Sequence, residues 1–577
     1  MGRKLAIALL VAFMAGTAGA RTLPPDAGDL PSEMEALRSF RLAESRALAA
    51  SMGRALARFP AAHQAVDVLH YDLDLSLDPY SRRIGGTVTA TLQATSACDS
   101  LTFLLHRALD LSSVQLDGGQ TTVKRKGDKI VLHPSAPLSP GSIHTVAITY
   151  SGTPATGGNL GGGMLFSEHD GVPAATTLSE PYESFTWWPC IDDVSDKVLA
   201  DIRLTVPASM AGVSNGTLEE VRANSDGTST YHWTEGYPIA NYLIAANVTN
   251  YAAFSQAYTS LDGLVTMPVD HFVYPEDLAR AQINFTRVPE MVAYYAGLCG
   301  EYPFLSEKYG MVAFPWGGGM EHQTITSMGD AFVGGSGSYN GIYAHELAHQ
   351  WWGDEVTCGT WNDIWLNEGF ATYFEALWLA RQYGLSEGEV MAWYDDGQVN
   401  GYMGGAVYLK NPKDPFADTG AIYDKGGWVL HMLRRVMGDG PFFEALRAYR
   451  SAHAYGNATT EDLRAACEQV YGSSLDWFFQ QWVYTPKRPV YEVSFAQAGS
   501  TVSVTLRQRQ THKIKHRTSQ RNVYIMPVDL TLHFEGGGDV TQTVWNDARS
   551  QTFTFSESRP VVAVGLDEAN WILKVAR

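Results

Sequence analysis

Two histidines and two glutamates within a short stretch constrain this chain more than any other feature. The segment from His345 to His349 reads HELAH, and on a helix this four-residue spacing puts both imidazoles on one face. Two imidazoles so placed can bind one Zn²⁺, with Glu346 projecting nearby. A catalytic zinc site also needs a third protein ligand and an open position for water. Glu368, separated from His349 by eighteen residues, lies at the start of the next predicted helix and is the expected third ligand.

The alternative is an exposed amphipathic helix whose two histidines are solvated. The neighbouring residues Ile342, Leu347, Trp351 and Trp352 make this helix largely apolar, so its His and Glu side chains would be costly to bury without a partner. A metal ion removes that conflict. The sequence Asn-Glu-Gly-Phe at 367–370 further favours the metal site.

Three motifs together carry a resemblance to a known family. HELAHQWWG at 345–353, NEGFATYFE at 367–375 and GGGME at 317–321 resemble the aminopeptidase N family of gluzincin zinc metallopeptidases, which includes leukotriene hydrolase. The similarity is collinear from about Asp67 to the C-terminus. It implies one Zn²⁺ per chain and hydrolysis of N-terminal residues from peptides that have a free N-terminus.

The resemblance also implies roles for single residues. His345, His349 and Glu368 match the family's zinc ligands, and Glu346 matches the general base that takes a proton from zinc-activated water. Tyr423, in the segment IYDKG, matches the tyrosine that donates to the oxyanion.

The implied substrate-binding residues come from two other segments. Gly318, Gly319, Met320 and Glu321 match the exopeptidase motif, whose glutamate binds the α-ammonium group of the substrate. Glu180 matches, more loosely, a second residue that anchors the amine.

The chain departs from the family pattern in two places. His322 stands where the family commonly has Asn, which could alter the orientation of Glu321 or make amine binding sensitive to pH. The large C-terminal helical domain of many members has no counterpart before Arg577, so its contacts with longer peptides cannot be carried over.

Glu375 lies two helical turns after Glu368 and leaves two interpretations open. It could steady a ligand histidine from behind, or it could be a solvated acid on the helix face. We do not include it in the predicted metal set.

Two other activities compete with the aminopeptidase. The same zinc site could serve an endopeptidase or a hydrolase of a small electrophile such as an epoxide, although the exopeptidase motif favours the aminopeptidase. A catalytically inactive binding protein should have lost a ligand or the base, and all four of these residues are present.

The predicted fold is multidomain, because 577 residues exceed one ordinary domain. Alternating apolar residues predict an N-terminal antiparallel β domain at 61–255, helical periodicity predicts an α+β domain at 256–486, and short alternating runs predict a C-terminal β-sandwich at 487–577. The family resemblance implies that the α+β domain is a thermolysin-like catalytic domain. Before these, residues 21–60 form a leader segment rich in Ala, Leu, Arg and Glu, which predicts that it is partly helical.

Residues 1–20 are predicted to be a cleaved signal peptide. Arg3 and Lys4 precede an apolar run, and a small-x-small site ends at Ala20. The run is shorter than the roughly 20 residues that span a bilayer, so a membrane anchor is the weaker alternative. We therefore expect a secreted or periplasmic protein with no membrane-spanning segment after cleavage.

Charge and cysteine usage narrow the partners further. With 42 Lys and Arg against 61 Asp and Glu the formal net charge is −19, which argues against a nucleic-acid partner. A basic run from Arg507 to Arg521 is expected to be a solvated hairpin loop, with docking of an anionic partner as the alternative. The five cysteines are widely spaced, which favours buried thiols over disulfides. The oligomeric state is not predicted.

Overall fold

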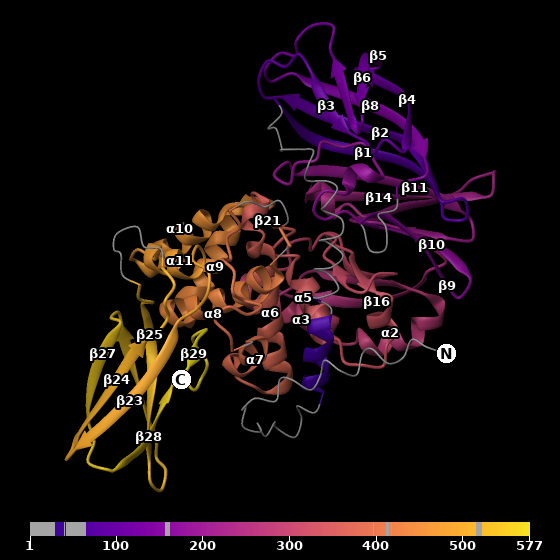
Figure 1. Cartoon of the computed structure of the whole chain (residues 1–577). Coiled ribbons are helices and arrows are strands. Elements are labelled where there is room, and N and C mark those ends of the chain that lie inside the picture. Colours follow the sequence, from indigo (N-terminus) through magenta and orange to yellow (C-terminus); the bar gives the residue numbers. More distant parts are fainter. Residues whose placement is uncertain are drawn as a thin grey trace, which may run out of the picture.

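The computed structural model describes residues 29–39, 41, 65–155, 162–395, 397–410, 415–416, 418–514 and 522–577. An N-terminal β domain, a mixed α+β catalytic domain and a C-terminal β-rich domain follow one another along an extended molecule (Figure 1). The predicted multidomain fold class is confirmed. The predicted signal peptide lies outside the described residues.

The N-terminal domain is built on a large twisted sheet. Among the described residues this sheet has eight strands in the order β13-β14-β11-β1-β2-β8-β4-β5. Their bounds are β1 Val66–Asp78, β2 Arg83–Ala94, β4 Leu109–Leu116, β5 Gly119–Gln120, β8 Ile143–Gly152, β11 Val198–Pro207, β13 Thr217–Ala223 and β14 Thr228–Ile239. Alternate residues of β1 are buried, as its period-two pattern predicts. The domain is not wholly antiparallel, because β1 pairs with β11 in parallel.

Two smaller sheets complete this domain. One has the order β12-β15-β10-β9 and the other β3-β7-β6 in the described part of the chain. Their bounds are β3 Leu101–Leu104, β6 Thr122–Lys126, β7 Lys129–His133, β9 Gly163–His169, β10 Val172–Leu178, β12 Ala211–Val213 and β15 Asn247–Thr249. The loop that follows β10 carries Glu180 toward the catalytic domain.

The catalytic domain begins with a mixed sheet of the order β16-β17-β18-β20-β19. Its strands are β16 Ala252–Thr259, β17 Thr266–Val273, β18 Tyr309–Phe314, β19 Gly319–Met320 and β20 Thr326–Gly329. Residues 252–255 fall within the predicted N-terminal domain, whereas in the structure β16 pairs along its length with β17 in the catalytic sheet. At the other edge, β19 pairs only with β20 among the described strands.

Helices pack beside this sheet and hold the predicted metal ligands. Their bounds are α2 Leu278–Asn284, α3 Val288–Cys299, α4 Asp330–Val333, α5 Asn340–Ala348, α6 Trp365–Tyr383, α7 Glu387–Tyr394, α8 Gly426–Met437, α9 Asp439–His453, α10 Thr460–Tyr471 and α11 Asp476–Trp482. A π-helical turn, η5 (Ala421–Lys425), leads into α8. A short parallel pair, β21 (Val356–Cys358) and β22 (Gly456–Ala458), ties the loop after α5 to the loop after α9.

The C-terminal domain has two sheets, as expected for a sandwich. Their orders among the described strands are β27-β24-β23-β29 and β26-β25-β28. The bounds are β23 Val490–Ala498, β24 Thr501–Gln508, β25 Met526–Phe534, β26 Val540–Asn546, β27 Ser550–Ser556, β28 Val561–Leu566 and β29 Val575–Ala576. This domain lies beyond α8 and α11, away from the N-terminal β domain (Figure 1).

Part of the predicted leader segment is described, and it is helical. Residues 30–39 and 41 form one helix, which we call the leader helix. In Figure 1 this indigo helix lies beside the catalytic domain, where its residues contact α5 and α6, rather than on the β domain that follows it in sequence.

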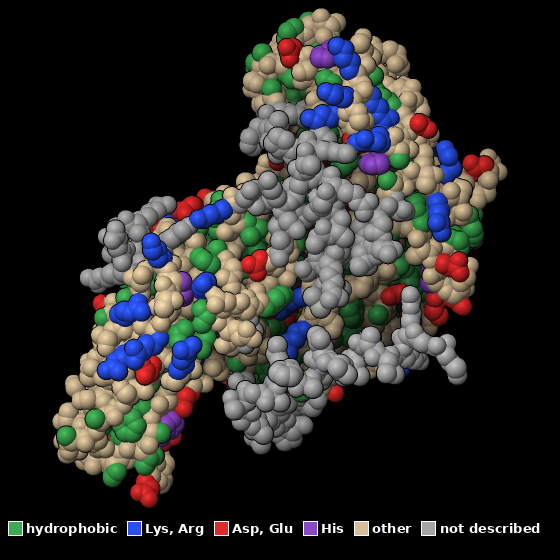
Figure 2. Space-filling model, in the orientation of Figure 1, with side chains coloured by type: hydrophobic (Ala, Val, Ile, Leu, Met, Phe, Trp, Pro, Cys, Tyr) green, Lys and Arg blue, Asp and Glu red, His purple; other side chains and the backbone are tan. Residues whose placement is uncertain are grey.

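The remaining expectations concern thiols, membranes and charge. All five cysteines are buried and form no disulfide, which confirms the prediction of buried thiols. No helix in the described ranges is long and apolar enough to cross a membrane. Lys and Arg side chains are spread over the visible face, mixed with acidic ones (Figure 2). Within the basic run, Arg509 pairs with Glu492 of the same domain, and residues 515–521 lie outside the described residues.

Candidate active site

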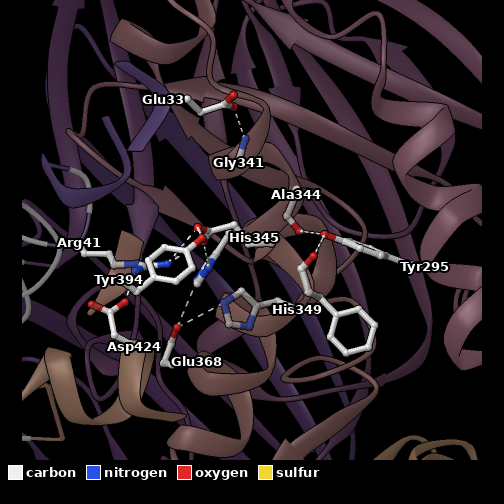
Figure 3. A network of polar contacts seen from close by, with 12 residues as sticks. Glu33, Arg41, Tyr295, Gly341, Ala344, His345, His349, Glu368, Tyr394 and Asp424 are labelled. Carbon is white, nitrogen blue, oxygen red and sulfur yellow. Dashed lines mark hydrogen bonds and ion pairs between the residues drawn. The ribbon is translucent and has the colours of Figure 1, made fainter. Parts of the chain in front are cut away.

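Helices α5 and α6 bring the three predicted metal ligands to one point. His345 lies in the last turn of α5, His349 directly follows that helix, and Glu368 lies in the first turn of α6. Oε2 of Glu368 is 3.5 Å from Nε2 of His345 and 3.4 Å from Nε2 of His349. All three side chains are buried. Figure 3 shows them converging from the two helices.

These distances match a tetrahedral zinc site. Zinc binds imidazole nitrogen and carboxylate oxygen at about 2.0–2.1 Å, and the edge of such a tetrahedron is then about 3.3–3.4 Å. The two nitrogen–oxygen separations are close to that edge and too long for good hydrogen bonds. The donor set His, His, Glu is also the one expected for a catalytic zinc with an open position. The residues present therefore fit the ion.

The outward nitrogen of each histidine is held by a partner. Nδ1 of His345 lies 2.9 Å from Oε2 of Glu375, and Nδ1 of His349 lies 3.1 Å from the backbone oxygen of Trp352. When each Nδ1 carries a proton and donates a hydrogen bond to its partner, Nε2 keeps its lone pair for the metal. Glu375 is fully buried, so it is not a solvated acid on the helix face. The structure thus supports the interpretation in which Glu375 steadies a ligand histidine from behind.

The charge of the third ligand is favoured by the same neighbours. Burial by itself opposes ionisation of Glu368, but the imidazoles of His349 and His345 outweigh it and lower the pKa of this carboxyl group to about 2. The group is therefore a carboxylate at neutral pH, as a metal ligand must be.

A close crossing of two helices brings Tyr423 to the ligands. Gly369 follows Glu368, and a Cβ added there would lie 2.8 Å from Cα of Gly426 at the start of α8. Only glycine allows this approach. The π-helical turn η5 then places the ring of Tyr423 parallel to that of His345, with 5.8 Å between the ring centroids. Such turns often occur at functional sites.

The predicted base lies against the exopeptidase motif. A Cβ on Gly319 would be 2.4 Å from Oε1 of Glu346, so the carboxylate occupies the space that a side chain would need. A Cβ on Gly318 would be 2.4 Å from the ring of Trp316. A side chain at Gly319 would therefore displace the predicted base, and one at Gly318 would displace Trp316. Met320, the second residue of β19, is buried.

The two predicted amine anchors lie beside the same centre. One carboxylate oxygen from each of Glu180, Glu321 and Glu368 falls within 4.8 Å of the others. Glu180 is 1% exposed and Glu321 is 3% exposed. Oε1 of Glu321 has no hydrogen-bond partner within the described residues, and burial raises the pKa of this carboxyl group. A buried acid in this state favours a cationic ligand.

His322 does not titrate near neutral pH. Its ring is fully buried, its Nδ1 lies 2.8 Å from Oγ of Ser327, and burial lowers its pKa to about 3. The sequence left open that this residue makes amine binding sensitive to pH. The imidazole instead stays neutral, because a charge on it would be desolvated.

Some residues of the centre had no signal in the sequence. The carboxylate of Glu375 also accepts hydrogen bonds from Tyr394 and from Arg41 of the leader helix. Asp424 is also bound to Arg41. Of these residues, only Glu375 could have been linked to the site from the sequence, through its spacing from Glu368. The contacts of Arg41 join segments that are far apart in the chain.

Sequence profiles of two known domains match this chain. That of the peptidase M1 N-terminal domain matches residues 68–243, and that of the peptidase family M1 domain matches residues 300–482, which contain the three ligands. The chain belongs to peptidase family M1. Membership implies one catalytic Zn²⁺, in agreement with the fit of the ligand geometry.

Relatives and solved structures agree with the M1 assignment. The M1 zinc metallopeptidase of Deinococcus radiodurans is 26% identical and superimposes with a TM-score of 0.65, over 73% of this chain and 94% of that structure. The probable aminopeptidase 1 of Sulfurisphaera tokodaii is 24% identical over 80% of this chain and 58% of its own length. The leukotriene A-4 hydrolase of Xenopus laevis is 24% identical over 78% of this chain and 76% of its own length. The chain spans roughly half the length of most curated aminopeptidases that it matches.

Proposed function

We propose that this M1 protein is an exported zinc-dependent aminopeptidase that removes N-terminal residues from peptides. The observation that carries the proposal is the buried pair of acids, Glu321 and Glu180, beside the metal ligands. A substrate ammonium group is the cation that this pair would accept. Because the anchors lie so close to the ligands, a peptide held by its amine presents its first peptide bond to the metal.

Several observations support peptides as substrates. Strand β19 lies at the edge of the catalytic sheet, where an extended peptide can add as a further strand. A variant of the D. radiodurans metallopeptidase has been solved with a Tyr-Ser-Ala substrate, and a variant of a two-domain M1 zinc metallopeptidase has been solved with L-tryptophan and with L-arginine. Many relatives bear the name aminopeptidase.

The proposed mechanism divides the chemistry among few groups. Bound zinc supplies a Lewis acid that activates water at neutral pH. Glu346 accepts the proton of the attacking water and later delivers it to the leaving amine. Tyr423 donates a hydrogen bond to the carbonyl oxygen as negative charge develops on it. Glu321, with Glu180, holds the ammonium group and sets the register.

Export rests on the N-terminal sequence. The charged start, the apolar run and the small residues before Ala20 support a cleaved signal. The N-terminal sequence of the protein recovered from culture medium or periplasm would test this. A mature chain starting at Arg21 is the expected result, and an intact Met1 would contradict it.

A panel of fluorogenic aminoacyl substrates, each paired with its N-acetyl counterpart, tests the activity. We expect cleavage of the free amines alone, loss of cleavage with a chelator and recovery with zinc. Equal cleavage of acetylated substrates would favour an endopeptidase. No cleavage by zinc-loaded protein would refute the aminopeptidase and bring the small-electrophile hydrolase forward.

A further inference from the structure

The leader helix is docked on the helix that carries two metal ligands. Leu30, Met34 and Leu37 are each no more than 1% exposed, so this face of the leader helix is buried in the catalytic domain. A Cβ added to Gly341 of α5 would lie 2.8 Å from Cδ1 of Leu37. The glycine therefore gives the leader helix room to touch the first turn of α5.

A polar contact joins the same two helices. Oε1 of Glu33 accepts a hydrogen bond from the backbone N–H of Gly341 at 2.6 Å (Figure 3). The residue that precedes α5, Tyr339, provides no side-chain cap. Glu33 thus supplies from another segment the acceptor that the start of a helix needs, and its negative charge suits that end.

The last described residue of the leader helix reaches the metal centre. The guanidinium group of Arg41, only 2% exposed, donates from Nη2 to both oxygens of Glu375, at 3.1 and 2.8 Å, and from Nη1 to Asp424. Its Cζ lies 4.7 Å from the ring centroid of Tyr394, whose hydroxyl donates to Glu375 at 2.5 Å. Figure 3 shows Arg41 beside Asp424 and Tyr394.

Both carboxylates that Arg41 binds are linked to active-site groups, one by a hydrogen bond and the other through the backbone. Glu375 accepts from Nδ1 of His345, one of the ligands. Asp424 is the neighbour in sequence of Tyr423, whose ring lies parallel to that of His345. One planar fork therefore fixes the positions of two segments, α6 and η5, that must keep the ligand and the oxyanion donor in register.

We propose that Arg41 is a positioning residue of the zinc site, and that the leader helix is thereby part of the catalytic centre of this chain. The proposal extends the proposed function, on which its kinetic part rests. Its metal-binding part can be measured without any substrate, so failure of one can be told from failure of the other.

The charge of Arg41 and its role in positioning Glu375 predict opposite changes in zinc affinity when Arg41 is replaced. Removing a cation near a bound Zn²⁺ would by itself tighten zinc binding, because like charges repel. Loss of the fork would loosen Glu375 and with it His345, and changes to such outer partners typically cost about 10- to 100-fold in metal affinity or activity. Weaker binding in Arg41→Met would thus report lost positioning.

The experiment compares single variants at Arg41, Arg434 and Glu375, and the Arg41→Met/Glu375→Gln double variant, with the parent, all as the full mature chain. Arg41→Met removes charge and fork, and Arg41→Lys keeps the charge without the fork. Arg434→Met is the control, because Arg434 is also buried and paired with carboxylates, Asp439 and Glu387. Within the described ranges its hydrogen bonds go to these two acids and to Tyr373, none of which is hydrogen-bonded to a metal ligand. Zinc affinity is measured by competition with a chromophoric chelator, folding by thermal unfolding, and kcat and KM on a free-amine substrate.

We expect Arg41→Met and Arg41→Lys to bind zinc about 10-fold more weakly and to lose kcat by about 10-fold with little change in KM. Arg434→Met should bind zinc like the parent. The effects of Arg41→Met and Glu375→Gln should not add in the double variant, because the first acts through the second. Unchanged or tighter zinc binding in folded Arg41→Met, or an equal loss in Arg434→Met, would overturn the proposal. If Arg41→Met does not fold, Arg41→Lys decides by the same criteria.

Discussion

Replacing Glu321 by Gln tests the amine anchor with little change in shape. The carboxylate is 3% exposed, so the charge that it offers to a substrate is poorly screened by solvent. At about 4 Å and an effective dielectric of about 20, two unit charges attract by about 4 kcal/mol. That corresponds to about 1,000-fold in kcat/KM. Glu180 lies in the same carboxylate cluster and remains, so we expect a loss of about 100- to 1,000-fold in Glu321→Gln.

The assay compares kcat/KM for one free-amine substrate and its N-acetyl form. In Glu321→Gln the ratio between the two should fall by the same factor, while zinc content and melting temperature stay near those of the parent. Asp567→Asn is the matched control, because Asp567 is a buried acid of the C-terminal domain that pairs with Lys574. An unchanged ratio in Glu321→Gln, with zinc still bound, would refute the anchor.

Four further substitutions test the active site and one buried histidine outside it. Glu346→Gln should keep zinc, measured by atomic absorption, and lose turnover by about 100- to 10,000-fold or more, as for loss of a general base; near-normal kcat would disprove the assignment. Tyr423→Phe should lower kcat by about 100- to 1,000-fold with KM nearly constant, and a change confined to KM would contradict an oxyanion donor. Gly319→Ala should abolish turnover while the fold persists by circular dichroism, because the new Cβ would lie 2.4 Å from Oε1 of Glu346; an active variant would argue against this packing. His431 is buried, and desolvation is the main reason that its pKa is lowered to about 3. Below about pH 6.5 the unfolded chain therefore binds a proton that the folded chain does not, so the free energy of unfolding falls as the pH falls. His431→Phe should therefore weaken the dependence of the melting temperature on pH between about pH 6.5 and 4. The same pH dependence in the variant and the parent would show that His431 does not contribute to it.

The sequence was informative where spacing along one helix carries the geometry. The spacing in HELAH predicts that His345 and His349 lie on the same side of one helix, and both reach the metal centre although α5 ends at Ala348, just before His349. The distance along the chain to Glu368 suits two packed helices. Glu375 was undecided because its position two turns after Glu368 says which face it shares but not what covers that face. Burial, which settles the question, depends on the packing of other segments around α6.

Contacts between remote segments could not be predicted. Nothing in the composition of the leader indicates that Arg41 reaches Glu375 and Asp424, because this pairing depends on where a helix docks after the whole domain has folded. The placement of β16 is a similar case. Its alternation predicts a strand, but only its pairing with β17 assigns it to the catalytic sheet.

The order in which the chain is made has a consequence for the leader helix. Arg41 and Asp424 are 383 positions apart, so the partners of the leader helix are synthesised long after it. At about 5–20 residues per second, that interval lasts roughly 20–80 s. Over this period the apolar face formed by Leu30, Met34 and Leu37 has no catalytic domain to cover it. A chain that ends before Asp424 lacks one of the two carboxylates that bind Arg41, so the leader helix can complete its contacts at the metal centre only late in synthesis.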